Sequence, residues 1–348
     1  MTKTQTLFQS YDLQDTLKLK NRIVMAPLTR CMATDELVPT QAMADYYARR
    51  ADAGLIISEA TLVSQDGQGY PNAPGLYTEA QVAGWKKVTQ AIHQNKGKIF
   101  AQIWHTGRVS HSIYHQGQVP MAPSAIRLEG RVPRTDDLEY ETPRAMNLED
   151  IERIKSNFVT AAKNAQRAGF DGIEIHGANG YLIDQFLHRD SNHRTDSYGG
   201  SIENMMRFLL EILTQVKAAT PDLAIGLRLS PQAYANMKHD DRDKELYDVL
   251  LSRLNQYNLA YIHTGMFNDS HNEFLGGTVT QYIRKNYLGT VIASGGYSAD
   301  DAVHAIENKY ADLVAIGRPF IANHDYVTKI QEQKKLVEYD PEMLTSLY

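Results

Sequence analysis

Short apolar runs alternate with amphipathic helical stretches along the whole chain. Most runs end in Gly, Pro, Ser or Thr and carry Ile, Val, Leu or Ala on both faces, as parallel strands covered on both sides must. We expect strands at residues 22–26, 55–59, 98–104, 172–176, 224–229, 260–264, 290–294 and 312–316. Strands of this kind, separated by helices, predict a parallel sheet.

Several of the intervening helices have recognisable ends. Thr78 and Gln81 form a capping box before a helix that Gly97 ends. Asn147, Ser201 and Ser298 are the expected N-caps of three further helices. The strand–helix units follow one another without a long linker, so we expect one α/β domain over residues 1–348, a (β/α)8 TIM barrel.

The competing α/β architecture is a doubly wound sheet. That fold usually shows Gly-x-Gly-x-x-Gly after its first strand, where this chain has Met25-Ala-Pro-Leu-Thr-Arg30. The barrel is therefore favoured.

One interval interrupts the regular spacing. Residues 106–146, after the third strand, have little helical period and are punctuated by Pro120, Pro123, Pro133 and Pro143. A loop this long at the end of a barrel strand is usually functional. We expect an extended loop subdomain that acts as a lid or wall on the catalytic face.

Composition narrows the classes of partner. Apolar residues make up 43% of the 348 residues, enough for a large core, and the net charge of −5 offers no attraction to nucleic acid. No window approaches the roughly 18 apolar residues of a membrane span, so we expect a cytoplasmic protein without a membrane partner. The single cysteine, Cys31, excludes an internal disulfide and a cysteine-based metal cluster.

Barrel enzymes build their sites at the C-terminal ends of the strands. After the seventh and eighth strands come Gly295-Gly296 and Gly317-Arg318-Pro319. Backbone amides and a guanidinium at these two ends predict a phosphate site. The alternative is that the glycines only form tight turns and that Arg318 pairs with a surface acid.

Two polar side chains are expected inside the barrel. Alternation along the fifth strand places Arg228 on the barrel axis, where a guanidinium needs an anionic or acceptor-rich partner. That partner is Glu174 on the neighbouring strand, a ligand across the barrel mouth, or both. Gln102 shares a face with Trp104 and suits an amide-like ring edge, or else is a satisfied core group.

The fourth strand leads into a compact polar set. His176, Asn179 and Tyr181 can together hold a polar oxygen and offer it a proton. A metal site is not favoured, because the first strand lacks His-x-His and no local ligand spacing is present. A Schiff-base aldolase is excluded because the only strand lysine, Lys98, lies at the bottom of the third strand.

Four segments, in order and covering nearly the whole chain, resemble the old yellow enzyme family. They are Asn21-Arg-Ile-Val-Met-Ala-Pro-Leu-Thr-Arg30, Gln102-Ile-Trp-His-Thr-Gly-Arg108, Glu174-Ile-His-Gly-Ala-Asn-Gly-Tyr181 and Arg194-Thr-Asp-Ser-Tyr-Gly-Gly-Ser-Ile-Glu-Asn204. The chain is most similar to the classical bacterial branch, which includes N-ethylmaleimide reductases and xenobiotic reductases.

The resemblance implies a non-covalent FMN on top of the barrel, reduced by NADPH or NADH and reoxidised by electron-poor alkenes. Residues implied to line the flavin ring are Pro27, Leu28, Thr29, Ala60, Gln102 and Arg228. Those implied to hold its phosphate are Gly295, Gly296, Gly317 and Arg318. His176 and Asn179 are implied to bind the substrate's carbonyl or nitro oxygen, Tyr181 to supply the proton, and Tyr70 and Trp104 to shape the pocket.

The chain departs from the family pattern at several positions. Met205 follows Asn204 where the family usually has Arg, so we expect a local ion pair to be missing. The C-terminal stretch from Glu338 to Tyr348 matches the family's aromatic tail poorly, so the sequence assigns it no pocket role. Asn179 stands where many bacterial relatives have His. A threonine at position 29 argues against the branch that tunes its flavin with a thiol.

The leading hypothesis is an FMN-dependent NAD(P)H ene-reductase acting on small molecules, as a monomer or homodimer. One alternative is a flavin reductase that acts mainly on nitro compounds, nitrate esters or quinones. Two others are a non-catalytic flavin-binding barrel and a cofactor-free barrel lyase that uses the same phosphate loops.

Overall fold

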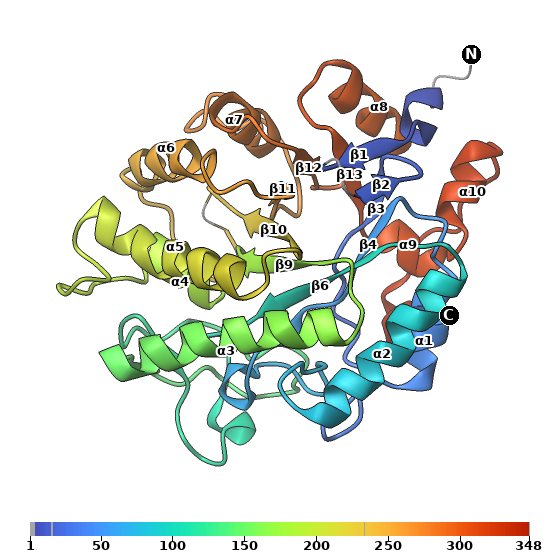
Figure 1. Cartoon of the computed structure of the whole chain (residues 1–348). Helices are drawn as coiled ribbons and strands as arrows, with labels where there is room; N and C mark the ends of the chain where they lie inside the picture. The colour runs from blue at the N-terminus through green and yellow to red at the C-terminus, as the bar shows by residue number, and fades with distance from the viewer. Residues whose placement is uncertain (1–3, 15–16, 233, 348) are drawn as a thin grey trace.

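Parallel strands form a closed barrel, and the helices that join them pack around its outside (Figure 1). The computed structural model describes residues 4–14, 17–232 and 234–347. The strands run in the order β4-β3-β13-β12-β11-β10-β9-β6, and β6 pairs with β4 to close the ring. They are β3 (Ile23–Met25), β4 (Leu55–Ile57), β6 (Ile99–Trp104), β9 (Gly172–Gly177), β10 (Ala224–Leu229), β11 (Tyr261–Thr264), β12 (Val291–Ala293) and β13 (Leu313–Ile316), with β5 (Thr61–Leu62) beside β6. The predicted barrel and its strand positions are confirmed.

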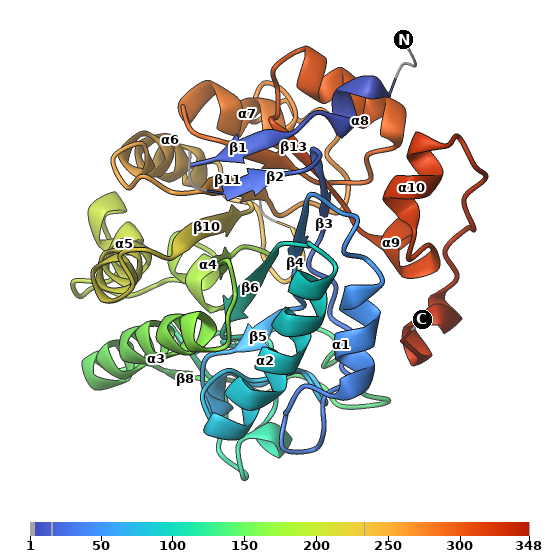
Figure 2. The ribbon, with the colours of Figure 1, turned by 45° about the vertical axis from the view of Figure 1, so that its right-hand side comes forward.

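The expected helix caps are also confirmed. Thr78, Asn147, Ser201 and Ser298 each accept a hydrogen bond from the backbone three residues later. Met205 is buried in the apolar core, where it packs instead of pairing. The helices are α1 (Gln41–Ala48), α2 (Glu79–Gln94), α3 (Leu148–Arg167), α4 (Leu182–Leu187), α5 (Ile202–Ala219), α6 (Asp243–Leu254), α7 (Val279–Asn286), α8 (Ala299–Glu307), α9 (Arg318–Ala322) and α10 (Tyr326–Gln331), seen from a second side in Figure 2. Within the described ranges, none combines the length and apolar character needed to cross a bilayer.

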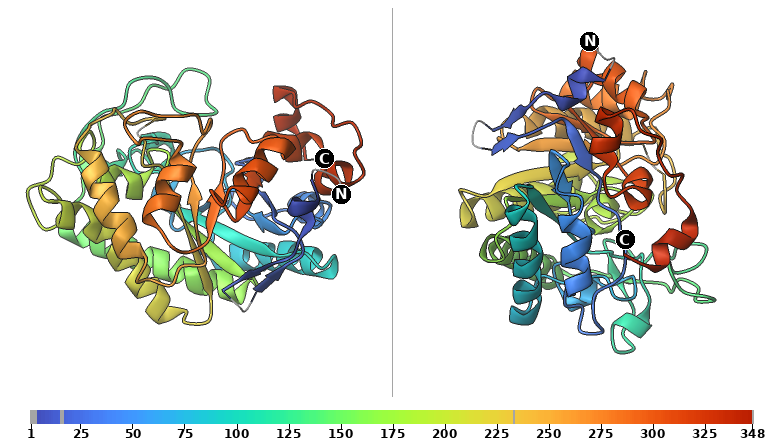
Figure 3. Two further views of the ribbon diagram at one scale, coloured as in Figure 1. Left: turned by 90° about the horizontal axis from the view of Figure 1, so that it is seen from above. Right: turned by 90° about the vertical axis from the view of Figure 1, so that its right-hand side faces the viewer.

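An N-terminal two-stranded sheet lies across the amino end of the barrel. Its strands, β1 (Tyr11–Leu13) and β2 (Leu17–Leu19), pair antiparallel. The fully buried side chains of Leu13 and Leu19 pack with barrel-interior residues such as Leu55 and Leu313, which begin their strands. Figure 3 shows this sheet at one end of the molecule and the long loop after β6 at the other. The site must therefore form at the opposite, carboxyl end.

The long loop between β6 and α3 has a small core of its own. It contains a 3₁₀ turn at Ser112–Tyr114 and the short paired strands β7 (Met121–Ala122) and β8 (Arg144–Ala145). The buried Arg108 guanidinium donates to the Ile126 carbonyl at 3.4 Å and to the Asn236 carbonyl at 3.0 Å, which ties the loop to the segment after β10. The loop core consists of Val109, Leu128, Val132 and Tyr140, and Tyr181 packs against it.

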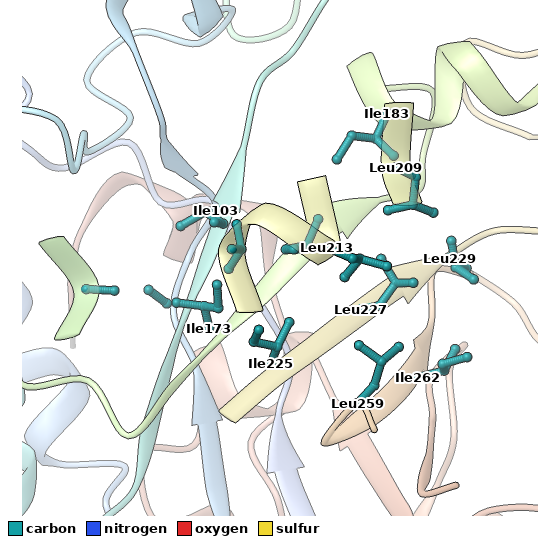
Figure 4. Close-up of a cluster of buried hydrophobic side chains, with 14 of the residues drawn as sticks. Ile103, Ile173, Ile183, Leu209, Leu213, Ile225, Leu227, Leu229, Leu259 and Ile262 are labelled. Atoms are coloured by element: carbon teal, nitrogen blue, oxygen red, sulfur yellow. The ribbon is translucent and has the colours of Figure 1, made fainter. Parts of the chain in front are cut away.

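Alternation along β10 decides which side chains enter the barrel. Ile225, Leu227 and Leu229 point outward and pack with helix residues such as Leu209 and Leu213 (Figure 4). The intervening positions therefore face the barrel interior. This confirms the inward placement of Arg228 that the sequence predicts.

A buried ionic network stands behind the loop that follows β9. The His188 ring donates to Asp243 at 2.8 Å and faces Asp184 at 3.2 Å, and these three side chains are at most 2% exposed. The Tyr247 hydroxyl donates to Asp184 at 3.0 Å. Burial alone would lower the pKa of His188, but the two carboxylates outweigh it and raise that pKa to about 10. The ring is therefore a buried cation at neutral pH.

Asp184 connects this network to the loop after β9. Its second carboxylate oxygen accepts hydrogen bonds from the Gly180 amide at 2.9 Å and the Ser230 hydroxyl at 3.1 Å. The Ser230 hydroxyl oxygen in turn accepts a hydrogen bond from the backbone N–H of Asn179 at 2.9 Å. Asn179 and Gly180 both have positive φ, 62° and 76°, so this turn needs such anchoring. The network fixes the backbone from which Asn179 and Tyr181 project.

His188→Gln should show how much the buried cation stabilises the fold. Its removal leaves two carboxylates facing each other, so we expect the free energy of unfolding to fall by about 3 to 5 kcal/mol at pH 6. The folded-state pKa is raised from 6.5 to about 10. The proton's contribution is therefore complete below pH 6.5 and is lost as the pH rises to 10. Urea unfolding of both proteins at pH 6, 8 and 10 measures this, and a difference that does not shrink with pH would contradict it.

Candidate active site

A cavity of about 580 Å³ opens at the carboxyl ends of β3, β10, β12 and β13. Its lining joins segments that lie far apart in the sequence. The expected cofactor residues that line it are Pro27, Leu28, Arg228, Gly295, Gly296, Gly317 and Arg318, and Met266, Phe267, Tyr297 and Tyr339 line it as well. The two expected strand ends for phosphate binding thus meet in one cavity, together with the inward guanidinium of Arg228.

The turn after β12 requires its two glycines. Gly295 has φ of 135° and Gly296 has φ of 83°. A Cβ at position 295 would lie 2.5 Å from the Asp269 amide nitrogen, a distance that real side chains do not tolerate. The bare backbone thus leaves the cavity open at the point where a phosphate is expected.

Arg318 reaches the same cavity from the start of α9. Its guanidinium carbon lies 4.4 Å from the centre of the Phe267 ring and 5.9 Å from that of Tyr339. Among the residues that the structure describes, Arg318 forms no ion pair with a carboxylate, so the alternative pairing with a surface acid is not observed. A cation held between two aromatic rings is ready for an anionic ligand.

Arg228 lies deeper in the cavity than Arg318. Its Nε donates to the Thr264 carbonyl at 3.4 Å, and no ion pair joins it to Glu174 within the described ranges. Glu174 is instead bonded to Gln102 at 2.7 Å and to His263 at 2.9 Å. Glu174 therefore acts on Arg228 through its charge and not through a hydrogen bond, and a ligand in the cavity is the direct partner that the contacts leave available.

The remaining expected ring neighbours come from β3, β4 and β6. Ala60 and Gln102 are buried, with 2% and 1% exposure, while Thr29 is half-buried and accepts a hydrogen bond from Arg134 through its carbonyl. Ala60 and Trp104 belong to one apolar cluster, against which Tyr70 and Tyr181 pack. The cluster forms a wall beside the cavity rather than part of its lining.

The expected catalytic groups form an aromatic cage at the end of β9. The His176 ring stacks on Trp104 with centroids 6.0 Å apart, and Tyr181 stands edge-on to both rings. Burial and the Arg228 guanidinium lower the pKa of His176 well below its ordinary value, so the ring is neutral. Its Nδ1 is fully buried and has no hydrogen-bond partner among the described residues.

The proposed proton donor is hydrogen-bonded to a second phenol. The hydroxyl oxygens of Tyr181 and Tyr70 lie 2.8 Å apart. Burial and the neighbouring Tyr70 raise the pKa of Tyr181 well above its ordinary value. Tyr181 is therefore fully protonated at neutral pH, as a general acid must be before it donates.

Asn179 is the expected residue whose side chain is already engaged. Its Nδ2 donates to the Gly265 carbonyl at 2.8 Å and to the Tyr234 hydroxyl. The positive φ of Asn179 turns the amide toward β11, which sequence spacing could not reveal. Tyr234 lies in the loop after β10, and no pattern in the chain marked it as a neighbour of the site.

The C-terminal stretch, to which the sequence assigns no pocket role, reaches the pocket through Tyr339. This side chain lines the cavity and approaches Arg318. The buried Arg30 guanidinium holds the following segment by donating to the carbonyls of Met343 at 2.8 Å and Ser346 at 2.6 Å. The hydrogen bonds of Arg30 join the two ends of the chain, so local sequence comparison could not reveal that the C-terminal segment lies at the pocket. Tyr348, the last residue of this stretch, lies outside the described residues.

The cavity fits FMN in its chemistry. Its glycine-lined end, with an unpaired guanidinium, suits a phosphate. Pro27 and Leu28 offer an apolar surface to a flat ring, and Arg228 offers a guanidinium toward a ring edge.

Comparisons with known proteins agree with this assignment. The NADH:flavin oxidoreductase / NADH oxidase family matches residues 6–336. The chain is 38% identical to 12-oxophytodienoate reductase 7 of Oryza sativa subsp. japonica, covering 97% of this chain and 90% of the relative. It is 40% identical to the "probable flavin mononucleotide-dependent alkene reductase" of Leishmania infantum, covering 93% and 90%.

Solved structures show the same relationship. The old yellow enzyme homologue from Zymomonas mobilis superposes with a TM-score of 0.90 at 36% identity and covers 99% of both chains, which is consistent with the bacterial branch. Morphinone reductase in complex with tetrahydroNAD superposes with a TM-score of 0.89 at 40% identity and covers 97% of this chain and 93% of its own. This chain therefore belongs to the old yellow enzyme family of FMN-dependent NADH:flavin oxidoreductases.

Proposed function

We propose that this protein reduces the C=C bond of alkenes conjugated to a carbonyl or nitro group, with NADPH or NADH as the donor and Tyr181 as the proton source. Bound FMN supplies the hydride that it has taken from the nicotinamide. The observation that carries the proposal is the cage of His176, Tyr181 and Trp104 at the carboxyl end of the barrel, beside the cavity. The similarity to an alkene reductase and to 12-oxophytodienoate reductases supports this substrate class.

His176 and Asn179 would hold the activating oxygen of the substrate. His176 is neutral, so its ring carries one N–H that would donate a hydrogen bond to the substrate oxygen. Asn179 would exchange its contact with Tyr234 for one with the substrate. Two donors on one oxygen withdraw electrons from the alkene and orient it.

Tyr181 would complete the reaction by protonating the carbon next to the activating group. Its hydroxyl is protonated and hydrogen-bonded to Tyr70, so a proton is available at a fixed position. The loop core that packs against Tyr181 covers it from one side. We further propose that the protein acts in the cytoplasm, as a monomer or homodimer, and that nitro compounds, nitrate esters and quinones use the same oxygen-binding pair.

Arg318→Leu tests the phosphate site. Loss of a charge-assisted contact should weaken FMN binding by about 10- to 100-fold. Riboflavin lacks the phosphate, so its affinity should be the same in the variant and the wild type. Fluorescence titration of the apoprotein with each flavin measures both values. An equal loss for both flavins would place Arg318 outside the phosphate site.

Tyr181→Phe tests the proton donor. The ring remains but the proton is lost, so reduction by NADPH should stay near the wild-type rate while reoxidation by 2-cyclohexenone falls by about 100-fold or more. Reduction of a nitro-olefin should suffer less, because solvent can protonate the nitronate later. Stopped-flow measurement of the two half-reactions separates the effects. Equal losses in both, or in neither, would exclude Tyr181 as the acid.

His176→Ala combined with Asn179→Ala tests the oxygen-binding pair. Loss of both donors should abolish tight binding of para-substituted phenols and slow reoxidation by enones. Titration with such a phenol, followed by its long-wavelength absorption band, measures the first effect. The pair would be structural only if the double variant still developed that band at wild-type phenol concentrations.

A further inference from the structure

Glu174 is a completely buried carboxylate whose two oxygens are both engaged. One oxygen accepts a hydrogen bond from Nε2 of Gln102 at 2.7 Å, and the other accepts one from Nδ1 of His263 at 2.9 Å. An ionised carboxylate can only accept hydrogen bonds, so the Gln102 amide must turn its nitrogen toward Glu174. The Gln102 oxygen is then free to accept a hydrogen bond from elsewhere. Glu174 therefore fixes which end of this amide is presented to a ligand.

Strand register places Glu174 on the strand next to Arg228 and two residues deeper in the barrel. Arg228 lies at the level of His176 on β9 and of His263 on β11. Glu174 lies at the level of Gln102 on β6 and of Gly226 on β10, two residues deeper. Gly226 has no side chain, and a Cβ there would lie 2.3 Å from the Tyr261 ring. The inward position of β10 nearest Glu174 thus contributes no charge of its own.

The charges of this layer are defined by its surroundings. Burial disfavours the charged form of Glu174, but His263 and the Arg228 guanidinium outweigh burial and hold the pKa of the carboxyl below its ordinary value. Burial also lowers the pKa of His263, which keeps that ring neutral. Glu174 therefore places a negative charge two residues deeper than the guanidinium that faces the cavity from β10. At low dielectric, each charge strongly affects a ligand that changes its own charge.

We propose that Glu174 is a positioning residue that orients Gln102 toward the bound flavin and offsets the positive field of Arg228, and thereby sets the reduction potential of the cofactor. This inference rests on the proposed placement of Gln102 and Arg228 along the flavin ring. A flavin gains negative charge when it is reduced. The guanidinium favours this gain and the buried carboxylate opposes it, so their removal has opposite effects on the potential.

The central experiment measures the reduction potentials of the FMN-loaded proteins by equilibration with a reference dye. Glu174→Gln keeps the shape of the side chain but removes its charge. At a fixed solution potential it should raise the ratio of reduced to oxidised flavin at least tenfold, which is a rise in the reduction potential of about 30 mV for a two-electron couple. It should also weaken FMN binding, because the Gln102 amide is no longer forced into one orientation. Arg228→Ala should lower the same ratio.

Glu174→Asp is the matched control. It keeps the negative charge but shortens the reach to Gln102, so the potential should stay within threefold of the wild-type ratio while FMN affinity falls. This variant also decides the question if Glu174→Gln does not fold. In Glu174→Asp, an unchanged dissociation constant for FMN would overturn the positioning role.

The outcomes separate this inference from the proposed placement of the cofactor. If Arg228→Ala leaves the potential unchanged, the placement of the flavin against Arg228 is wrong. If Arg228→Ala lowers the ratio but Glu174→Gln leaves it unchanged or lowers it, the placement stands and the role of Glu174 is overturned. A purely structural carboxylate would reduce the unfolding temperature in both Glu174 variants without moving the potential upward.

Discussion

A guanidinium on the inward face of a barrel strand is the constraint around which the site is organised. Arg228 cannot be enclosed without negative charge or acceptors nearby. Glu174, two residues deeper on the neighbouring strand, supplies the negative charge, and the open cavity above Arg228 leaves room for a ligand with acceptors. Glu174 also accepts hydrogen bonds from Gln102 and His263. The charge in the barrel interior and the guanidinium in the cofactor cavity therefore act on each other. An anionic ligand suits this cavity because the guanidinium of Arg228 needs negative charge or hydrogen-bond acceptors beside it.

The loop after β9 depends on a second buried charge of opposite sign. Asp184 carries the backbone of Gly180 and, through Ser230, that of Asn179, and it is itself held by the His188 cation. Tyr181, which follows directly, packs on the core of the long loop after β6. The proposed proton donor therefore stands where the barrel and its longest loop meet. Its position depends on the packing of both and not on the β9 strand alone.

The two proposed oxygen-binding residues are not equivalent in this structure. His176 has a buried nitrogen without a partner, whereas the Asn179 amide is satisfied by Gly265 and Tyr234. In the proposed binding mode, a ligand oxygen would replace an existing hydrogen bond at Asn179. Because an exchange contributes less free energy than a new bond, Asn179 would mainly fix the direction of the ligand.

The sequence by itself determined the strands and the helix caps, because those features depend on neighbours within a few residues. The barrel followed from the unbroken series of strand–helix units. Alternation on β10 predicts the inward Arg228, and the Thr78–Gln81 capping box is visible as a spacing of three. The strand-end rule also predicted the glycine turns and Arg318. Tertiary structure alone decided that Glu174 binds Gln102 and His263 rather than Arg228, that Tyr234 engages Asn179, and that Tyr339 lines the cavity. These contacts join residues from 55 to more than 80 positions apart, or the two ends of the chain, and only the packing of distant strands and segments side by side brings such residues within hydrogen-bond distance.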